Sequence, residues 1–313
     1  MFLCSLPMGD LFFAINLRRH INYNQMKKLL FALALILAAT SCGTSYLRVG
    51  SFNLWRSDLG KDDYRWEVRK HRLIDAISDI DFDIFAAQEV DTTMIRELPQ
   101  LFSKAGINYE IFIFSPYRED GGIGNKAQAI IYNPQRLEML DDHHFWFSET
   151  PDVMSGGWDE MKFRRGACCA FFLDKKTGEK FMFMSSHMPL GKIANLNAAS
   201  IINSRATLYN VDNLPAIFVG DLNTRPETES SQVLKTYWTD VYTLLPSDKR
   251  KGPHGTFNSH NTEKDMEKAA RIDYIYIKGT GIKVLNYCCF TGLYDGFYPS
   301  DHCPIYSDII IEK

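Results

Sequence analysis

Residues 216–223 read Ala216-Ile217-Phe218-Val219-Gly220-Asp221-Leu222-Asn223. The run up to Gly220 is apolar or small and predicts a strand, and two polar side chains follow it directly. Asp221 and Asn223 are two positions apart, so in an extended segment both point from the same face. Strand ends are where loops present reactive groups on a rigid scaffold. This stretch therefore predicts a core strand with a polar site at its end.

The same arrangement recurs along the chain. Polar side chains end or follow other predicted strands, namely Asn53, Glu89, His187, Asp273, and the pair Asp301-His302 just before residues 304–311. Taken singly, a strand-end Asp or Asn is usually a turn former, and a single His is usually structural. Their repetition on separate strand ends favours a shared site.

The chemistry of this set points to phosphate. Carboxylate and amide oxygens suit Mg²⁺ or Mn²⁺, and Glu89 with Asn53 or Asp301 would supply such ligands. Two histidines near acids would share a proton-transfer or charge-stabilising role. The set fits metal-assisted phosphoryl transfer, in which positioning and charge neutralisation dominate.

The remaining periodicity places the other elements. We expect helices over 64–80, 91–104, 192–210 and 228–235, and strands over 46–55, 83–88, 109–114, 127–132, 137–147, 167–173, 180–186, 215–220, 272–278, 282–290 and 304–311. No Pro-, Gly- or Ser-rich linker divides residues 46–313. The mixture favours one α/β or α+β domain with large sheets covered by helices.

Composition excludes several classes. The chain has 313 residues, 45% of them hydrophobic, and a formal net charge of −3. These values exclude a disordered tail protein, a collagen and a membrane bundle. The near-neutral charge argues against a protein that coats duplex DNA, but not against an enzyme that contacts a few phosphates.

The N-terminus reads as an export signal. Lys27-Lys28, the apolar run 29–39 and Thr40-Ser41-Cys42 follow one another in the required order. Cys42 after small residues resembles the lipobox of bacterial lipoproteins, in which that cysteine carries the lipid. The alternative is a buried N-terminal helix with an incidental cysteine.

We therefore expect four segments: an over-long start at 1–25, a lipoprotein signal peptide at 26–41, a tether at 42–45 and a catalytic domain at 46–313. The product would be exported and anchored through Cys42 to a bacterial membrane, in the periplasm or on the cell surface. Loss of four basic residues and one acidic residue with the leader changes the net charge from −3 to −6.

Two cysteine pairs, Cys168-Cys169 and Cys288-Cys289, lack the C-x-x-C spacing of zinc sites. Because neighbouring strand residues face opposite sides, we expect one thiol of each pair in the core and one outside it. Buried cysteine as a small apolar filler is the favoured interpretation.

Six segments together resemble the endonuclease/exonuclease/phosphatase superfamily. In order they are Ser51-Phe52-Asn53-Leu54, Gln88-Glu89-Val90, Ser186-His187-Met188, Gly220-Asp221-Leu222-Asn223, Arg271-Ile272-Asp273-Tyr274-Ile275 and Ser300-Asp301-His302. Residues 145–151, Gly157-Trp158-Asp159 and Arg165 also resemble a bacterial branch of that family. The resemblance implies a four-layer sandwich, in which two mixed β-sheets pack face to face with helices outside, and cleavage of phosphoester bonds with a divalent cation.

The resemblance also assigns roles. Glu89 would bind the metal, Asn53 would assist, and Asp301 would add a second carboxylate on the metal side. Asp221 and Asn223 would position the attacking water and the scissile phosphate.

His302 would act as a general base or transition-state stabiliser oriented by Asp273, while His187 would contact the phosphate from the other side. Arg165 would contact phosphate or support the structure, with Arg164 competing for that role.

One position departs from the family. Several members place a Glu just before the strand that matches 127–132, where it pairs with the first histidine. Here that position holds Lys126, which cannot orient His187 as a carboxylate does. It would contact an anionic substrate instead, or Glu119 would substitute as the partner.

Rival functions remain open. The favoured one is an active Mg²⁺- or Mn²⁺-dependent hydrolase, expected to be a monomer, that acts on nucleic acid, a phospholipid or a small phosphate ester. The alternatives are a non-catalytic lipoprotein that keeps the fold as a binding module, and a nuclease acting on extracellular nucleic acid. Four aromatic residues would stack on a substrate or belong to the core: Trp55, Trp158, Phe297 and Tyr298.

Overall fold

The computed structural model describes residues 45–116, 126–162 and 164–312. From Tyr46 onward these residues form one compact unit. The expected N-terminal extension, the signal peptide and Cys42 lie outside the described residues. Among the described helices, none combines the length and the apolar character needed to cross a bilayer.

One sheet has eight strands and is mixed. Its order is β10-β13-β14-β1-β2-β4-β3, with β12 also paired to β14. The strand β1 runs parallel to β2 and antiparallel to β14. The bounds are β1 (Leu47–Asn53), β2 (Ile84–Val90), β3 (Glu110–Phe114), β4 (Ala127–Tyr132), β10 (Arg250–Lys251), β12 (Ile282–Val284), β13 (Tyr287–Cys289) and β14 (Ile305–Ile311).

The second sheet has six strands in the order β5-β6-β7-β8-β11-β9. Its β7 and β8 are parallel, whereas β6 pairs antiparallel with β7 and β11 pairs antiparallel with β8. The bounds are β5 (Leu137–Trp146), β6 (Gly166–Asp174), β7 (Lys180–His187), β8 (Ala216–Asp221), β9 (Thr239–Asp240) and β11 (Asp273–Lys278).

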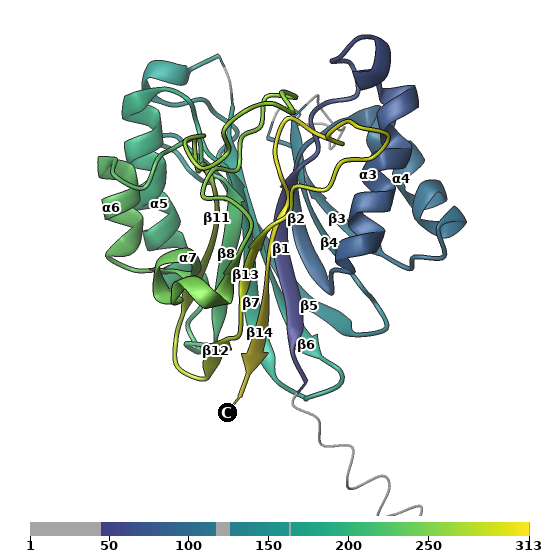
Figure 1. Ribbon diagram of the computed structural model, residues 1–313. Coiled ribbons are helices and arrows are strands. Elements are labelled where there is room, and N and C mark those ends of the chain that lie inside the picture. Colours follow the sequence, from purple (N-terminus) through teal and green to yellow (C-terminus); the bar gives the residue numbers. More distant parts are fainter. Residues whose placement is uncertain (1–44, 117–125, 163, 313) are drawn as a thin grey trace, which may run out of the picture. The chain divides into compact units, whose positions relative to one another are not determined.

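Helices cover the outer faces of both sheets. Figure 1 shows α3 and α4 beside the eight-stranded sheet and α5 and α6 beside the six-stranded one. Their bounds, with those of the short α7, are α3 (Trp66–Ile80), α4 (Thr92–Lys104), α5 (Lys192–Tyr209), α6 (Glu229–Lys235) and α7 (Val241–Leu244). Short 3-10 turns lie at Asp62–Tyr64, Trp158–Glu160 and Ser247–Lys249. The expected fold, a four-layer sandwich of two mixed sheets with helices outside, is confirmed.

The core follows from side-chain alternation along each strand. In β7, Phe181 and Phe183 pack into the layer between the two sheets, and Met182 and Met184 pack into the layer beneath the helices. Both faces are therefore apolar, as expected of strands covered on both sides. The inward-facing row of β7 ends in His187, so the alternation that builds the core also aims this side chain inward.

The same burial corrects the prediction for the cysteine pairs. Cys168 faces the layer between the sheets and Cys169 faces the helices, yet both are fully buried. Cys288 and Cys289 are buried as well. The prediction of one outside thiol per pair was wrong, because it assumed a sheet with one face open to solvent. All five cysteines of the described chain are free and buried, which fits their role as apolar fillers.

The single strand expected over 282–290 is two short strands, β12 and β13. Asn286 interrupts it by bonding sideways to β14: its Nδ2 donates to Asp308 at 2.7 Å, and its Oδ1 accepts from the Asp308 N–H at 2.9 Å. Such side-chain bonds compete with the regular ladder. The structure also adds β9, β10 and α7, which periodicity does not reveal in segments of two to four residues.

Candidate active site

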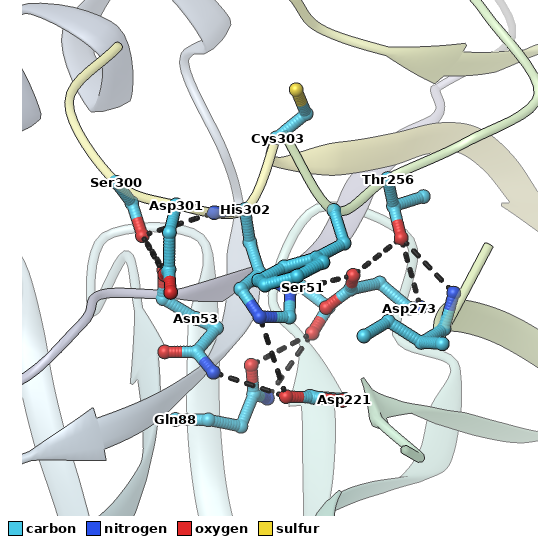
Figure 2. Close-up of polar contacts among 12 residues, drawn as sticks. Ser51, Asn53, Gln88, Asp221, Thr256, Asp273, Ser300, Asp301, His302 and Cys303 are labelled. Atoms are coloured by element: carbon cyan, nitrogen blue, oxygen red, sulfur yellow. Dashed lines mark hydrogen bonds and ion pairs between the residues drawn. The ribbon is translucent and has the colours of Figure 1, made fainter. Parts of the chain in front are cut away.

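The strand ends of both sheets meet at one end of the sandwich. Asn53 closes β1 of the larger sheet, and Asp221 closes β8 of the smaller one. Asn53 Nδ2 donates to Asp221 Oδ2 at 3.0 Å, so a hydrogen bond joins the two sheets here (Figure 2). One step deeper, Ser51 and Gln88 hydrogen-bond to each other. The apolar core thus gives way to a buried polar layer, as the strand-end pattern predicts.

Asp221 lies at the centre of this layer. Its Oδ2 is 3.3 Å from His187 Nε2 and 3.7 Å from His302 Nε2, and its Oδ1 accepts the Asn223 backbone N–H at 3.0 Å. Burial works to raise the pKa of Asp221, but the two histidines outweigh it and hold that pKa well below its usual value. Asp221 is therefore an ionised carboxylate flanked by two imidazoles.

His302 forms a charged pair with Asp273. His302 Nδ1 is 2.9 Å from Asp273 Oδ2, and Thr256 Oγ1 donates to the same oxygen at 2.6 Å (Figure 2). Burial works to lower the pKa of His302, yet Asp273 and Asp221 outweigh it and raise that pKa well above its usual value. Nδ1 of His302 is therefore fixed by Asp273 and Nε2 is directed toward Asp221, and both carboxylates favour the protonated ring.

His187 has the opposite character. Burial, and after it the Arg165 guanidinium, lowers the pKa of His187 despite Asp221. Its Nδ1 is buried and has no hydrogen-bond partner among the residues that the structure describes. The surroundings thus shift the pKa values of the two histidines on Asp221 in opposite directions, lowering that of His187 and raising that of His302.

A second acidic group lies beside this triad. Glu89 has a left-handed backbone, with φ of 58°, at a bulge in the pairing of β2 with β4 between Ala87 and Val90. Bulges re-aim side chains near active sites. Burial raises the pKa of Asp301 to about 6, and Glu89 and Asp221 add to that effect while His302 opposes it. Glu89 and Asp301 are therefore close enough for their charges to interact.

Two residue sets could hold a cation. Asp221, Asp273 and His302 bring potential ligand atoms within 4.8 Å of one another. Their mutual hydrogen bond and the Thr256 donor already use these atoms, so a cation there would break the His302–Asp273 pair. The oxygens of the predicted set, Glu89, Asp301 and Asn53, are less occupied by hydrogen bonds within the described chain.

Glu89 accepts only from the Arg56 N–H at 3.5 Å, and Asp301 accepts from Ser300 Oγ at 3.4 Å, within the described chain. Asn53 Oδ1 accepts the Trp55 N–H at 3.0 Å and retains a second lone pair. Oxygen donors of this kind fit Mg²⁺ or Mn²⁺.

Arg165 lies close enough to His187 for its charge to lower the pKa of that imidazole. Arg165 is buried, whereas Arg164 is half-buried and its Nη1 contacts Met154 Sδ at 3.0 Å. Its burial and its effect on the pKa of His187 thus favour Arg165 over Arg164 as the candidate site residue. Lys126 is half-buried directly before β4, and the Glu119 suggested as a substitute partner for His187 lies outside the described residues.

Sequence reasoning missed two supports of the site. Thr256 bonds Asp273, and Asn258 Nδ2 donates to the Ser300 carbonyl at 3.1 Å. Both lie in an irregular loop without strand or motif context, so no signal in the sequence singles them out. Arg69 is also fully buried, and its guanidinium donates to the Leu54 carbonyl at 2.7 Å, which fixes the chain just after Asn53.

The surroundings offer space and aromatic surface. A cavity of about 400 Å³ adjoins Asn223 and is lined by Lys192, Asn195, Arg225 and Ile272 among others. Of the four aromatic residues considered from sequence, Tyr298 belongs to the core, while Trp55, Trp158 and Phe297 are half-buried.

The chain is similar to known proteins over most of its length. The model of the Endonuclease/Exonuclease/phosphatase family matches residues 50–302. A family protein from Bacteroides vulgatus has 26% identity and a TM-score of 0.76, with 86% of this chain and 100% of that chain covered. The mannosyl-6-phosphatase from Bacteroides thetaiotaomicron has 27% identity and a TM-score of 0.72, with 85% and 100% covered.

An uncharacterised protein of Acanthamoeba polyphaga mimivirus is 28% identical over 163 residues, which cover 51% of this chain and 60% of that protein. The chain thus spans less than two thirds of that relative.

Proposed function

The chain belongs to the endonuclease/exonuclease/phosphatase family, and from this premise we propose that it is an exported, divalent-metal-dependent hydrolase of phosphate esters. The observation that carries the proposal is the buried Asp221 carboxylate, whose Oδ2 lies 3.3 Å from His187 Nε2 and 3.7 Å from His302 Nε2, with His302 paired in turn to Asp273 at 2.9 Å. A decayed binding module would not need to keep two buried histidines and a second carboxylate arranged around one buried aspartate. The non-catalytic alternative is therefore less favoured.

Glu89, Asp301 and Asn53 would hold the Mg²⁺ or Mn²⁺. When bound, such an ion neutralises phosphate charge and polarises the scissile P–O bond. Burial raises the pKa of Asp301, and Glu89 adds to that effect, so the two carboxylates lie close enough for their charges to interact.

The protein residues would orient the attacking water and stabilise the charge that develops on the phosphoryl group. Asp221 would orient the attacking water toward phosphorus and accept its proton while the P–O bond to the alcohol breaks, and the leaving alkoxide would take up a proton from solvent. His302 would stabilise the charge that develops on the phosphoryl oxygens, with Asp273 keeping its ring in place. Asn223 and Arg165 would contact the phosphoryl group, and His187 would hold Asp221 from the other side.

The substrate would be a phosphate ester outside the cytoplasm. The similarity to a mannosyl-6-phosphatase makes a sugar phosphate the first compound to test. The half-buried Trp55 and Phe297 keep an extracellular nucleic acid, and so a nuclease, as the second candidate, because bases stack on such rings.

A substrate screen tests the function. The full-length chain is assayed with Mg²⁺ or Mn²⁺ on sugar phosphates, nucleotide monoesters, short RNA, supercoiled DNA and sphingomyelin, beside its Asp221→Asn variant. We expect hydrolysis of at least one substrate to fall by about 10³-fold or more in the variant, as for loss of a group acting directly at the reacting centre. Equal rates in both proteins would make the activity a contaminant and would favour the binding module.

Export and lipid attachment are a separate part of the proposal. Cys42 would become the lipidated N-terminus after cleavage behind Ser41, and the mature protein would be a monomer. Mass spectrometry of protein expressed in a bacterial host would show a diacylglyceryl-modified Cys42 in the membrane fraction. An unprocessed chain, or an unchanged fractionation of Cys42→Ser, would overturn this part.

A further inference from the structure

Arg165 and Lys126 are two basic residues that lie close enough for the charge of Arg165 to lower the pKa of Lys126. Arg165 is 3% exposed, and its Nε and Nη1 are buried without a hydrogen-bond partner in the described ranges. A buried guanidinium N–H without a hydrogen-bond partner is costly in free energy, because the group has lost its hydration and gained no bond in return. Arg165 is therefore built for a ligand with several acceptor oxygens. Lys126 is the second basic group of the pair.

The sandwich brings the two residues to the same place. Gln128 in β4 donates through Nε2 to the carbonyl of Gly166 in β6 at 2.6 Å, which links the two sheets. Lys126 directly precedes β4 and lies two residues before Gln128. Arg165 directly precedes Gly166. The link thus brings together the two chain segments that carry Lys126 and Arg165.

Electrostatics agree with this placement. Burial, and after it Arg165, lowers the pKa of Lys126, while Glu89 raises it. Arg165 also lowers the pKa of His187. Each cation is therefore felt by the groups that surround the reacting phosphate, and Lys126 lies within the field of the predicted metal ligand Glu89.

Resting on the function proposed above, we propose that Lys126 and Arg165 form a subsite for a terminal phosphate dianion, so that the enzyme acts on phosphomonoesters in preference to phosphodiesters. A monoester phosphate carries about −1.5 to −2 charges near pH 7 and has three strong acceptor oxygens. A diester carries one negative charge and uses one of those oxygens for its second carbon substituent. Two cations beside a divalent metal ion match the first group, and the guanidinium fork suits its oxygens.

The test compares two substrates with the same leaving group, p-nitrophenyl phosphate and bis(p-nitrophenyl) phosphate, on the full-length chain with Mg²⁺. We expect the wild type to favour the monoester by about 10-fold or more in kcat/KM. Lys126→Met should lower the monoester value by about 10- to 100-fold and the diester value by less than about 3-fold, in the range of lost charge-assisted contacts. Lys126→Arg should retain most of the preference, and Lys126→Glu should abolish it.

Lys180→Met is the matched control, because Lys180 is exposed at the opposite end of the β7 strand that carries His187. It should leave both values unchanged. A wild type that prefers the diester, or a Lys126→Met variant that loses both activities equally, would overturn the subsite.

A binding experiment separates this inference from the enzyme proposal. Inorganic phosphate is titrated into wild type and Lys126→Met by calorimetry at pH 5.5 and pH 8. The wild type should bind more tightly at pH 8, where phosphate is mainly the dianion, and the variant should lose that gain. If neither ester is hydrolysed, the enzyme proposal fails while this result still decides the subsite. Equal binding by both proteins would overturn it.

Discussion

Asp273 touches His302 through the ring nitrogen that faces away from Asp221. This contact both orients the imidazole and keeps it charged. Thr256, which lies in a loop and not at a strand end, donates a hydrogen bond to the Asp273 oxygen that contacts His302. Thr256, Asp273, His302 and Asp221 thus form a row of contacts, in which the two carboxylates raise the pKa of the histidine between them.

Asp273→Asn tests that chain. The amide keeps the volume but removes the negative charge, so the pKa of His302 should fall toward its ordinary value. We expect kcat to drop by about 10²- to 10⁴-fold with little change in KM, as for other carboxylate–histidine pairs. If protonated His302 is the active form, the alkaline limb of the pH–rate profile should move to lower pH. A profile of unchanged shape would show that His302 does not act as a cation.

His260 gives a separate test through stability. Its ring packs 4.1 Å from the centroids of both Trp55 and Tyr64, and neither ring nitrogen has a partner within the described chain. Burial, followed by Arg69 and His302, lowers the pKa of His260 to about 4. The unfolded chain takes up this proton near pH 6.5, but the folded chain does so only near 4. Stability is therefore lost as pH falls from 6.5 to 4.

His260→Phe should remove that part of the pH dependence. Free energies of unfolding in urea at pH 7 and pH 4.5 would be compared for the two proteins. Allowing for solvent screening of a partly exposed ring, wild type should lose about 1–2 kcal/mol more than the variant between these values. Equal losses would contradict neutral burial of His260.

Helix α4 begins at a residue that serves two elements. Asp91 Oδ1 accepts the Met94 N–H at 3.0 Å, the bond of an N-cap, and Oδ2 accepts the Ser57 N–H at 2.6 Å. The second bond fixes the loop that follows Asn53 and Trp55. The cap signal is visible in the sequence, whereas the bond to a loop 34 residues away is not.

Asp91→Ala should destabilise the protein by about 1–2 kcal/mol, because it leaves donors at a helix start and in a loop without their acceptor. Asp91→Asn separates the two contacts, because asparagine is an equally good N-cap but its single acceptor oxygen cannot also accept the Ser57 N–H, so its loss of stability should be smaller than that of the alanine variant. Urea unfolding of the three proteins measures the effect. Equal stability of the alanine variant and wild type would show that Asp91 holds neither element.

The length of an element decides whether the sequence predicts it. The long strands and helices are predictable, because each repeats a clear period over six or more residues, and Asn53, His187 and Asp221 are predictable as their polar ends. The short β9 and β10 are not, because two residues carry no period. Burial of both members of Cys168-Cys169 depends on helices covering the outer face of β6, which is a tertiary property.

For the whole molecule, prediction from sequence is limited by the long sequence separation between residues that join the two sheets. The Asn53–Asp221 bond spans 168 residues and the Gln128–Gly166 bond spans 38, each joining one sheet to the other. No local pattern predicts which strand ends will meet. The packing of the sandwich decides that Arg165 is buried while Arg164 and Lys126 stay half-buried.

The central claim is that this end of the sandwich binds a divalent ion and uses it to hydrolyse a phosphate ester. The most direct measurement is activity of the full-length chain after chelation, as Mn²⁺ or Mg²⁺ is returned, for wild type and Glu89→Gln. We predict no activity without metal, saturable recovery in wild type, and a requirement for at least about 10-fold more metal in the variant, as expected when one carboxylate ligand is lost. Full activity in the presence of chelator, or identical titrations for both proteins, would contradict the account.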